Sequence, residues 1–290
     1  MAFAPTVWAG APDPMWIQAT DTPLFVSHSR LRGRTPEGLP RADRNRWVLD
    51  SGAFSFITWF GAFPDDPRDY ARRVRLYDAV IGGLEWAAIQ DWMCEPDSLA
   101  VTGLSVAEHQ RRTVASYLDL TAAWEAMSTH RPDSPFMPGL QGWTPADYVR
   151  CVRMYQAAGV DLAAAPVVGL GSVCKREDTE EIAEVVATVR AEVPGIRLHG
   201  FGVKTGGLAR YGAELHSCDS MAWSYAAWKR RIKSARCTQF HRVCSSCLIA
   251  AEDWHAKVWP EFVAARADAA PATSPVEFRA DPAGQFLLIS

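Results

Sequence analysis

Short apolar runs alternate with longer amphipathic stretches along most of the chain. Of all the sequence features, this alternation restricts the possible folds most. The short runs are typical of buried strands, whereas the longer stretches carry apolar residues at helical spacing. Strand, helix and strand in repeated succession predict parallel pairing with right-handed crossovers. The expected strands are 23–29, 46–52, 86–92, 135–142, 161–171, 196–204 and 215–223, and the expected helices are 67–82, 105–127, 144–159 and 177–193.

Six or seven such units favour an α/β fold of the TIM-type (β/α)8 barrel over a doubly wound sheet. No Gly-x-Gly-x-x-Gly follows an early strand, which weakens a dinucleotide-binding interpretation. The chain has 290 residues and is 48% hydrophobic, which is enough for one barrel with an appendage. We expect the barrel over residues 1–236, a small C-terminal zinc-binding helical subdomain over 237–264 and a loose Ala- and Pro-rich tail over 265–290.

Two expected helices carry clear end signals. Ser105 and Glu108 form a capping box, and Thr144 with Pro145 begins the helix that ends before Gly159. Seven cysteines, an odd number, favour a reducing compartment over a disulfide framework. The first residues do not resemble a signal peptide, and no apolar run approaches membrane-spanning length, so we expect a cytoplasmic protein without a membrane segment.

Polar residues recur at the predicted carboxyl ends of successive strands. One such Asp alone more often caps a helix than reacts with a substrate. In a barrel, however, these ends meet at one face, where active sites lie. We therefore expect a functional site formed by Asp50, Asp91, Gln141, the Gly169–Gly171 and Gly200–Gly202 segments and Asp219.

The segments around these residues resemble a known enzyme group. DSGAF (50–54) is similar to the DSGG(F/Y) motif of tRNA-guanine transglycosylases, and LQGW, VVGLGS, HGFGV and CDSMAW match further motifs in order over about residues 45–255. DSGAFS, GLGSVCK, DSMAWS and a compact Cys/His cluster resemble the deazapurine DNA modification protein A family more closely. The chain is identified as a member of that divergent branch.

The resemblance implies exchange of guanine in DNA for 7-cyano-7-deazaguanine (preQ0). Asp219 would be the nucleophile that forms a covalent bond to the sugar, and Asp50 the general acid and base. The alternatives are a tRNA-guanine transglycosylase and a catalytically idle zinc-containing nucleic-acid-binding protein. The implied base-binding residues are Ser51, Phe54, Asp91, Gln141, Gly142, Gly169, Leu170, Gly171, His199 and Gly200, with simple core packing as the alternative for Phe54.

Residues 237–255 concentrate metal-ligand side chains. Cys244-x2-Cys247 suits tetrahedral zinc, with Cys237 and either His241 or His255 nearby. A helix that begins near Cys247 would place His255 about 12 Å farther along its axis, at about 1.5 Å per residue. We therefore predict a structural zinc ion on Cys237, His241, Cys244 and Cys247.

A net charge of −3 means that any nucleic-acid contact must come from local patches. From Ser220 to Ala251 the chain has no Asp or Glu, and a second basic group spans residues 30–46. We expect DNA as partner, with tRNA as the alternative, together with a 7-deazaguanine base; accessory DNA-modification proteins and a homodimer are open. The predicted phosphate contacts are Lys229, Arg230, Arg231, Lys233 and Arg236.

Overall fold

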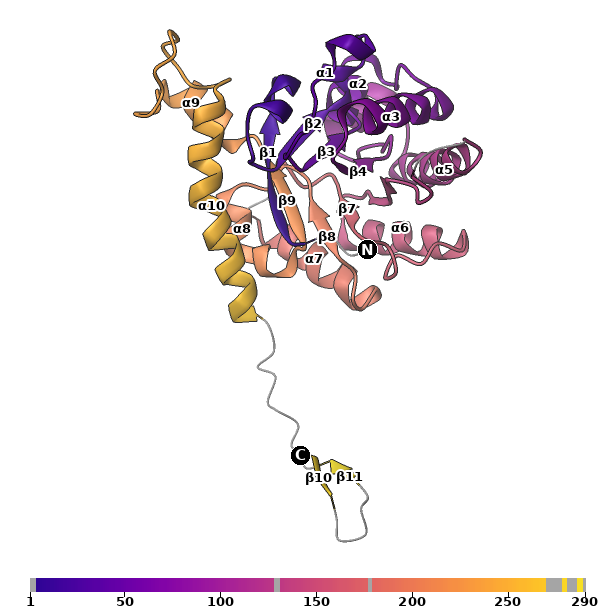
Figure 1. The fold of residues 1–290 in the computed structure, drawn as a ribbon. Helices are drawn as coiled ribbons and strands as arrows, with labels where there is room; N and C mark the ends of the chain where they lie inside the picture. Colours follow the sequence, from indigo (N-terminus) through magenta and orange to yellow (C-terminus); the bar gives the residue numbers. More distant parts are fainter. Residues whose placement is uncertain (1–3, 128–130, 177–178, 270–277, 281–285, 289–290) are drawn as a thin grey trace.

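The fold is a barrel of parallel strands surrounded by helices (Figure 1). The computed structural model describes residues 4–127, 131–176, 179–269, 278–280 and 286–288. The strands of the barrel are β1 (Thr6–Ala11), β2 (Leu24–Ser27), β3 (Trp47–Asp50), β4 (Leu84–Ala88), β5 (Phe136–Met137), β6 (Gly139–Leu140), β7 (Val168–Leu170), β8 (Leu198–Gly200) and β9 (Ser217–Ser220).

The order of the strands shows how the barrel is formed. It runs β5-β4-β3-β2-β1-β9-β8-β7-β6, and every neighbouring pair is parallel. Only Pro138 separates β5 from β6, yet the two strands lie at opposite ends of the order. Residues 136–140 therefore act as one interrupted strand that nearly closes the sheet on itself. This arrangement confirms the predicted TIM-type barrel.

Helices form the outer layer and connect successive strands. Thr144 caps α6 with a reciprocal capping box to Asp147, and the Ser105 side chain accepts from the Glu108 N–H at the start of α5. The helices predicted from periodicity are thus present. Their bounds are α1 (His28–Leu31), α2 (Ala53–Phe60), α3 (Pro67–Ile81), α4 (Pro96–Thr102), α5 (Val106–Glu125), α6 (Pro145–Ala157), α7 (Glu180–Glu192), α8 (Thr205–Tyr211), α9 (Ala222–Arg230) and α10 (Leu248–Ala269), with 3-10 turns at Pro14–Gln18, Pro36–Gly38 and Gly212–Glu214.

Alternate residues of the strands face two different apolar environments. Side chains that point outward, such as Leu49 and Leu198, pack against the helices. Side chains that point inward form a separate cluster from several strands. That inner cluster consists of Trp8, Val48, Trp86, Ala88, Met137 and Val167, with Phe25 and Phe201 packed against it.

Three expectations about strands need correction. The first strand, β1, was not predicted, although it pairs with both β2 and β9. The strand expected at 86–92 ends at Ala88, so Asp91 lies in the following loop. The strand expected at 161–171 is limited to β7, because the Asp161 side chain accepts from the N–H groups of Ala163 and Ala164 and holds a turn there.

Helix α10 is the last helix of the outer layer and packs beside β1 (Figure 1). Its His255 side chain contacts the Val7 carbonyl oxygen of β1 at 3.0 Å. The helix includes residues 248–264 of the expected zinc-binding segment and the start of the expected tail, whereas the four expected ligands precede it. Most of that tail lies outside the described residues; a short antiparallel pair, β10 (Phe278–Ala280) with β11 (Phe286–Leu288), is described. Among the described helices, none combines the length and apolar character that a membrane crossing requires.

Candidate active site and metal centre

Asp50 ends β3, beside Ser27 at the end of β2. Gly52 then turns the chain into α2 with a φ of 81°, and a Cβ atom there would lie 2.7 Å from the Phe56 ring. Burial raises the pKa of the Asp50 carboxyl to about 6, and the negative charge of Asp219 adds to the rise. Hydrogen bonds from Ser27 and the Gly52 N–H oppose it. Asp50 can therefore hold or release a proton near neutral pH.

Asp91 lies in the loop after β4, and its carboxyl is buried. Burial raises its pKa to about 7, with the charge of Asp50 as the next cause. The Ser51 hydroxyl donates to one carboxyl oxygen at 3.3 Å, and the Gln141 amide donates to the other. Two neighbouring strand ends thus bring two coupled carboxyl groups together, each with a raised pKa.

A buried chain of hydrogen bonds, not expected from the sequence, continues from Gln141. The Ser172 hydroxyl lies 2.6 Å from Gln141 Oε1 and 3.1 Å from Glu95 Oε2, and it accepts from the Cys94 N–H at 2.7 Å. A hydroxyl has one hydrogen to donate. If it donates to Gln141, Glu95 must be protonated to donate in turn, and burial does raise the pKa of Glu95.

This chain fixes the orientation of the Gln141 amide. Its oxygen faces Ser172 and its NH2 group faces Asp91. Ser172 reaches the position with a φ of 58°, in the left-handed region that serine seldom adopts. The signal for this network was present in the sequence, since Glu95 and Ser172 belong to the QDWMCEP and VVGLGS segments.

Asp219 on β9 has a different environment. Its Oδ1 accepts from the Gly202 N–H at 2.9 Å and lies 3.3 Å from His199 Nε2. The other ring nitrogen of His199 lies 2.9 Å from the Ser217 hydroxyl. With Ser217 donating to Nδ1, Nε2 carries the hydrogen and donates to Asp219. Two donors are thus directed at one oxygen of the Asp219 carboxyl group.

Aromatic rings hold His199 in place. Its ring is stacked on Phe25 at 5.8 Å between centroids, and Trp86 and Phe201 meet it edge-on at 4.8 Å and 4.9 Å. The imidazole is fully buried. The hydrogen bond from His199 to Asp219 therefore comes from a ring with little freedom to move.

The remaining predicted base-binding residues lie at or near these strand ends. Phe54 is 53% exposed on α2, with the Lys175 ammonium 6.0 Å from its ring, so core packing does not explain it. Leu170 packs its side chain into the outer core, which leaves only its backbone for a ligand. Gly142 and Gly200 lie against Tyr148 and Leu215. A Cβ at Gly169 would meet Phe201, and one at Gly171 would lie 2.1 Å from Gln141 Nε2.

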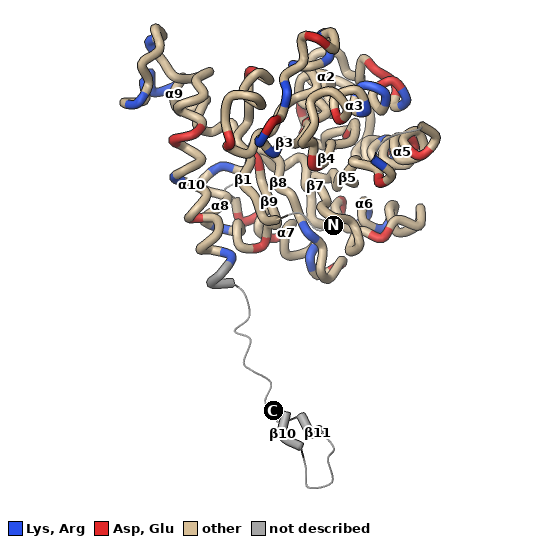
Figure 2. Tube along the Cα trace, viewed as in Figure 1, with Lys and Arg blue, Asp and Glu red and all other residues tan. Residues whose placement is uncertain are grey.

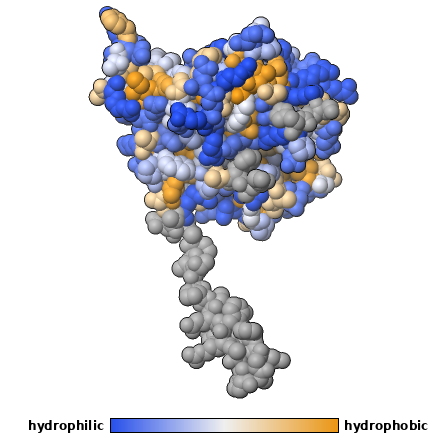
Figure 3. All heavy atoms as spheres, in the orientation of Figure 1, coloured by the Kyte–Doolittle hydropathy of each residue, from blue (hydrophilic) through white to orange (hydrophobic). Residues whose placement is uncertain are grey.

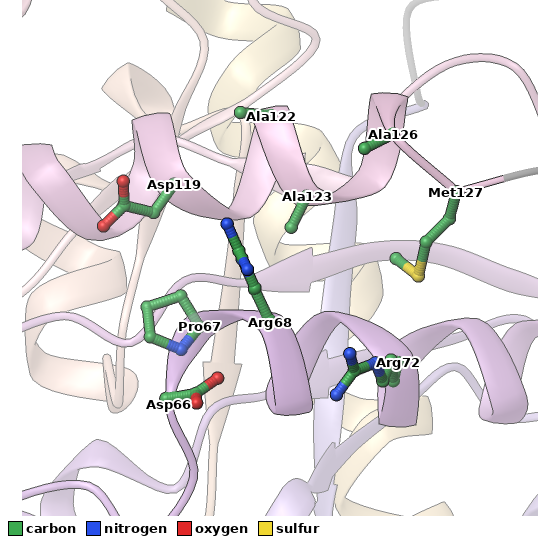
Figure 4. Close-up of a pocket in the computed structure, with 9 residues that line it drawn as sticks. All are labelled: Asp66, Pro67, Arg68, Arg72, Asp119, Ala122, Ala123, Ala126 and Met127. Atoms are coloured by element: carbon green, nitrogen blue, oxygen red, sulfur yellow. The ribbon is translucent and has the colours of Figure 1, made fainter.

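A pocket of about 840 Å³ lies elsewhere, between α3 and α5 (Figure 4). Arg68 and Arg72 of α3 line one side, and Asp119 and two alanines of α5, with Ala126 just after its end, line the other. None of its lining residues belongs to the strand ends described above. The candidate active site is therefore defined by the convergence of carboxyl groups and not by this pocket.

The four predicted metal ligands lie together between α9 and α10. The ligand atoms of Cys237, His241, Cys244 and Cys247 all lie within 4.8 Å of one another. His241 Nε2 is 3.2 Å from both Cys237 Sγ and Cys244 Sγ, and Cys237 Sγ is 3.6 Å from Cys247 Sγ. Zinc with Zn–S bonds of about 2.3 Å and Zn–N bonds of about 2.0–2.1 Å gives tetrahedral edges of about 3.5–3.8 Å. The cluster could hold a metal ion, and its donor set suits zinc.

The structure separates the two histidines considered as ligands. His241 belongs to the cluster, whereas His255 contacts the Val7 carbonyl of β1. Near the cluster, the Ser234 N–H donates to Cys244 Sγ at 3.3 Å. Such a bond stabilises a thiolate ligand.

The predicted phosphate-binding residues are all exposed on α9 and the segment that follows it. Figure 2 shows this part of the chain with blue segments and no red ones. Arg236 differs from the other predicted phosphate-binding residues because it forms an ion pair with Asp253 of α10. In the second basic group, Arg32 pairs with Asp65, Arg44 with Asp21 and Arg46 with Glu85, so much of that charge is neutralised within the protein.

Comparison with known proteins identifies the family of this chain. No curated protein matches the sequence. The model of one family, DeoxyPurine in DNA protein A, matches residues 4–278, a range that includes all the strand-end residues and the four-residue metal cluster. The chain therefore belongs to the DeoxyPurine in DNA protein A (DpdA) family.

Proposed function

We propose that this protein exchanges guanine in DNA for 7-cyano-7-deazaguanine through a covalent bond between Asp219 and the deoxyribose. Membership of the family implies a role in deazapurine modification of DNA. The observation that carries the proposal is the pairing of two carboxyl groups at one end of the barrel, close enough for the charge of Asp219 to raise the pKa of Asp50. Burial raises the pKa of Asp50 to about 6, whereas Asp219 accepts hydrogen bonds from Gly202 and His199.

In the first step, an oxygen of the Asp219 carboxylate attacks C1′ of the target nucleotide. The C1′–N9 bond breaks, and its electron pair remains on the purine. Protonated Asp50 donates its proton to the departing purine, which leaves as neutral guanine. Asp219 is then joined to the sugar by an ester-like bond.

In the second step, the incoming deazapurine binds where guanine was. The Asp50 carboxylate takes the proton from N9, and N9 attacks C1′. The bond between Asp219 and the sugar breaks, and the carboxylate is restored. Two displacements at the same carbon give net retention of configuration, as in retaining glycosidases.

The base would lie between the two carboxyl groups and the Gln141 network. The ionised Asp91 carboxylate would accept hydrogen bonds from the ring N–H and the exocyclic amine of guanine. These bonds would replace the one that Asp91 accepts from the Gln141 amide. Gln141 and the backbone at Gly171 would contact the carbonyl side. The exposed Phe54 ring would stack on the base, a contact worth about 1–3 kcal/mol.

The metal cluster has a structural role in this proposal. Four protein ligands around zinc leave no open position for a reacting water molecule. When bound, zinc would hold together the segment between α9 and α10. This segment directly follows β9, which carries Asp219.

A paired base-exchange assay tests the proposal. The purified protein is incubated with 7-cyano-7-deazaguanine and either duplex DNA or unmodified tRNA, and the nucleosides are then analysed by mass spectrometry. We expect deazapurine in DNA, and none with Asp219→Asn. Incorporation in tRNA alone would assign the chain the tRNA reaction. Absence of incorporation in both, with accessory proteins of the same modification system supplied, would contradict base exchange.

A further inference from the structure

The outer face of α9, the helix that follows β9 and Asp219, exposes large apolar side chains. Tyr225 is 53% exposed and Trp228 is 60% exposed, and their ring centroids lie 6.0 Å apart. The two residues are three positions apart, so they lie on one face of the helix. Met221 precedes them at 40% exposure, and Ile232 follows at 44%. We call these four residues the α9 surface.

The α9 surface is concave on one side. A hollow of about 310 Å³ lies between α9 and Ser245–Ser246, and Met221, Tyr225 and Trp228 line it. In Figure 3, the part of the molecule that projects beside α10 shows hydrophobic residues among hydrophilic ones. Exposed aromatic rings next to a hollow mark a binding surface more often than isolated exposed apolar residues do.

The chain segment that forms the α9 surface carries basic residues and no acidic ones. Lys229 and Arg230 end α9, Arg231 follows, and no Asp or Glu occurs from Ser220 to Ala251 (Figure 2). The Lys229 ammonium lies 5.7 Å from the Tyr225 ring. None of the ion pairs found among the described residues involves Lys229, Arg230 or Arg231. This arrangement is complementary to a polyanion that also carries flat apolar groups.

The opposite face of α9 is firmly attached. Trp223 and Ala227 are buried, and the Trp223 ring lies 5.8 Å from that of Trp16. The Ser224 hydroxyl donates to the Ser245 carbonyl at 2.5 Å, and the Cys244 N–H donates to the Ile232 carbonyl at 2.9 Å. The exposed rings are therefore presented on a helix held to the barrel and to the metal-binding segment.

We propose that the α9 surface is a subsite for an unpaired nucleobase next to the target guanine, with Trp228 and Tyr225 stacking on the base and Lys229 and Arg230 contacting its phosphates. This subsite rests on the proposed function, because it assigns the polyanion as DNA. Aromatic stacking combined with cations is the general mode by which proteins bind single-stranded nucleic acid. A target guanine must leave the base stack to reach Asp219, so unpaired bases beside it are expected during the reaction.

The position of the α9 surface suits this role. Helix α9 begins three residues after Asp219, and Trp228 is six residues farther, about 9 Å along the axis at about 1.5 Å per residue. A neighbouring nucleotide of an extended strand can span such a distance. The subsite would hold the DNA strand near Asp219. The base-binding residues at the ends of the other β-strands would remain free to bind guanine.

A DNA strand without guanine tests binding at this subsite independently of guanine binding in the active site. The affinity of the full-length, metal-loaded protein for a fluorescent thymidine dodecanucleotide is measured by anisotropy at several salt concentrations. Trp228→Ala and Tyr225→Ala are each expected to raise Kd about fivefold to 150-fold with an unchanged salt dependence. Lys229→Gln and Arg230→Gln are each expected to lower the salt slope by about 0.7.

Two controls define the result. Trp228→Phe keeps a stacking ring and should retain most of the affinity, while Leu118→Ala removes an exposed apolar side chain of α5 and should change nothing. Metal content and thermal stability verify that each variant is folded. An unchanged Kd for folded Trp228→Ala overturns the subsite. An unchanged Kd together with loss of a wild-type dimer in sedimentation also overturns it, and assigns the surface to a second copy of the chain.

The same variants keep the two proposals distinguishable. Weaker binding of Trp228→Ala to the thymidine strand supports the subsite even if the wild-type protein exchanges no base. Normal base exchange with an unchanged Kd for the thymidine strand supports the proposed function and overturns the subsite.

Discussion

The carboxyl groups at the two sides of the barrel opening differ in their neighbours. On the side of β3, β4 and β7, Asp91 is buried near half-buried Asp50 and buried Glu95, and the pKa of each of the three carboxyl groups is raised. On the side of β8 and β9, Asp219 accepts from a backbone N–H and lies within hydrogen-bonding distance of a fixed imidazole. We call these the base side and the sugar side.

The difference matches the two demands of base exchange. A group that moves a proton must change its charge near neutral pH, which burial and neighbouring negative charge make possible. A carboxylate nucleophile must instead remain ionised, which hydrogen-bond donors favour. The raised pKa of Asp50 suits the first demand, and we assign the second role to Asp219.

Substitution of the two catalytic candidates is expected to have the largest effects. Asp219→Asn removes the nucleophile and should abolish base exchange and the covalent complex with DNA. Asp50→Asn should lower the exchange rate about 10²–10⁴-fold, the usual contribution of general acid-base catalysis. Mass spectrometry of the nucleosides measures both rates. Equal residual base-exchange rates in Asp219→Asn and Asp50→Asn would contradict the different roles assigned to the base side and the sugar side.

Removal of the metal should affect the sugar side first. The metal-binding segment follows β9 and α9, whereas the base-side residues belong to earlier strands. A chelator, or Cys247→Ser, should lower the melting temperature and the rate of covalent complex formation. Binding of free 7-cyano-7-deazaguanine, measured by calorimetry, should persist. An equal loss of covalent complex formation and of 7-cyano-7-deazaguanine binding would indicate that the metal cluster stabilises the whole barrel.

The pH dependence of stability tests the base side. The folded-state pKa values of Asp50 and Asp91, about 6 and about 7, exceed the unfolded value of about 3.9. The folded state therefore binds the extra protons, and the stabilisation they give is fully present below about pH 4. It is lost as the pH rises through about 6 and 7.

Asp91→Asn should weaken this dependence. The free energy of unfolding of the wild type should fall relative to that of the variant between about pH 4 and about pH 8, as measured by urea denaturation. Asp97→Asn, which changes an exposed carboxylate paired with Lys175, is the matched control. Parallel curves for wild type and Asp91→Asn would contradict the raised pKa of Asp91.

Ser172→Ala should have the smallest effect among these changes. It frees the Gln141 amide to rotate and leaves the Cys94 N–H without its acceptor, at a cost of about 1–3 kcal/mol of stability. We expect KM for the deazapurine to rise about tenfold, with little change in the rate of covalent complex formation from DNA. A lower rate of that first step with unchanged KM would place Ser172 on the sugar side.

Sequence periodicity predicted the barrel because most strands and long helices alternate clearly. It did not predict β1, whose TVWAGA sequence contains alanine and glycine and is ordered by pairing with β2 and β9. It also placed Asp91 at a strand end, whereas the strand stops at Ala88. Local patterns do not contain the long-range pairing that decides such strand limits.

The candidate site was predicted in part for a similar reason. Residues at or just after the carboxyl ends of the strands in a barrel converge, so Asp50, Gln141 and Asp219 could be grouped in advance. The bonds from Ser172 to Gln141 and Glu95 join residues 31 and 77 positions apart, and only the folded chain brings them together. The four metal ligands lie within eleven residues, so their spacing alone was informative.

Trapping of the covalent intermediate tests the central claim most directly. The metal-loaded protein is mixed with duplex DNA, denatured, digested with nuclease and analysed by intact-protein and peptide mass spectrometry. We predict a deoxyribose adduct on Asp219 in the wild type, its slower formation in Asp50→Asn and its absence in Asp219→Asn. An adduct on Asp50, or an adduct that persists in Asp219→Asn, would contradict the assignment of the nucleophile to the sugar side.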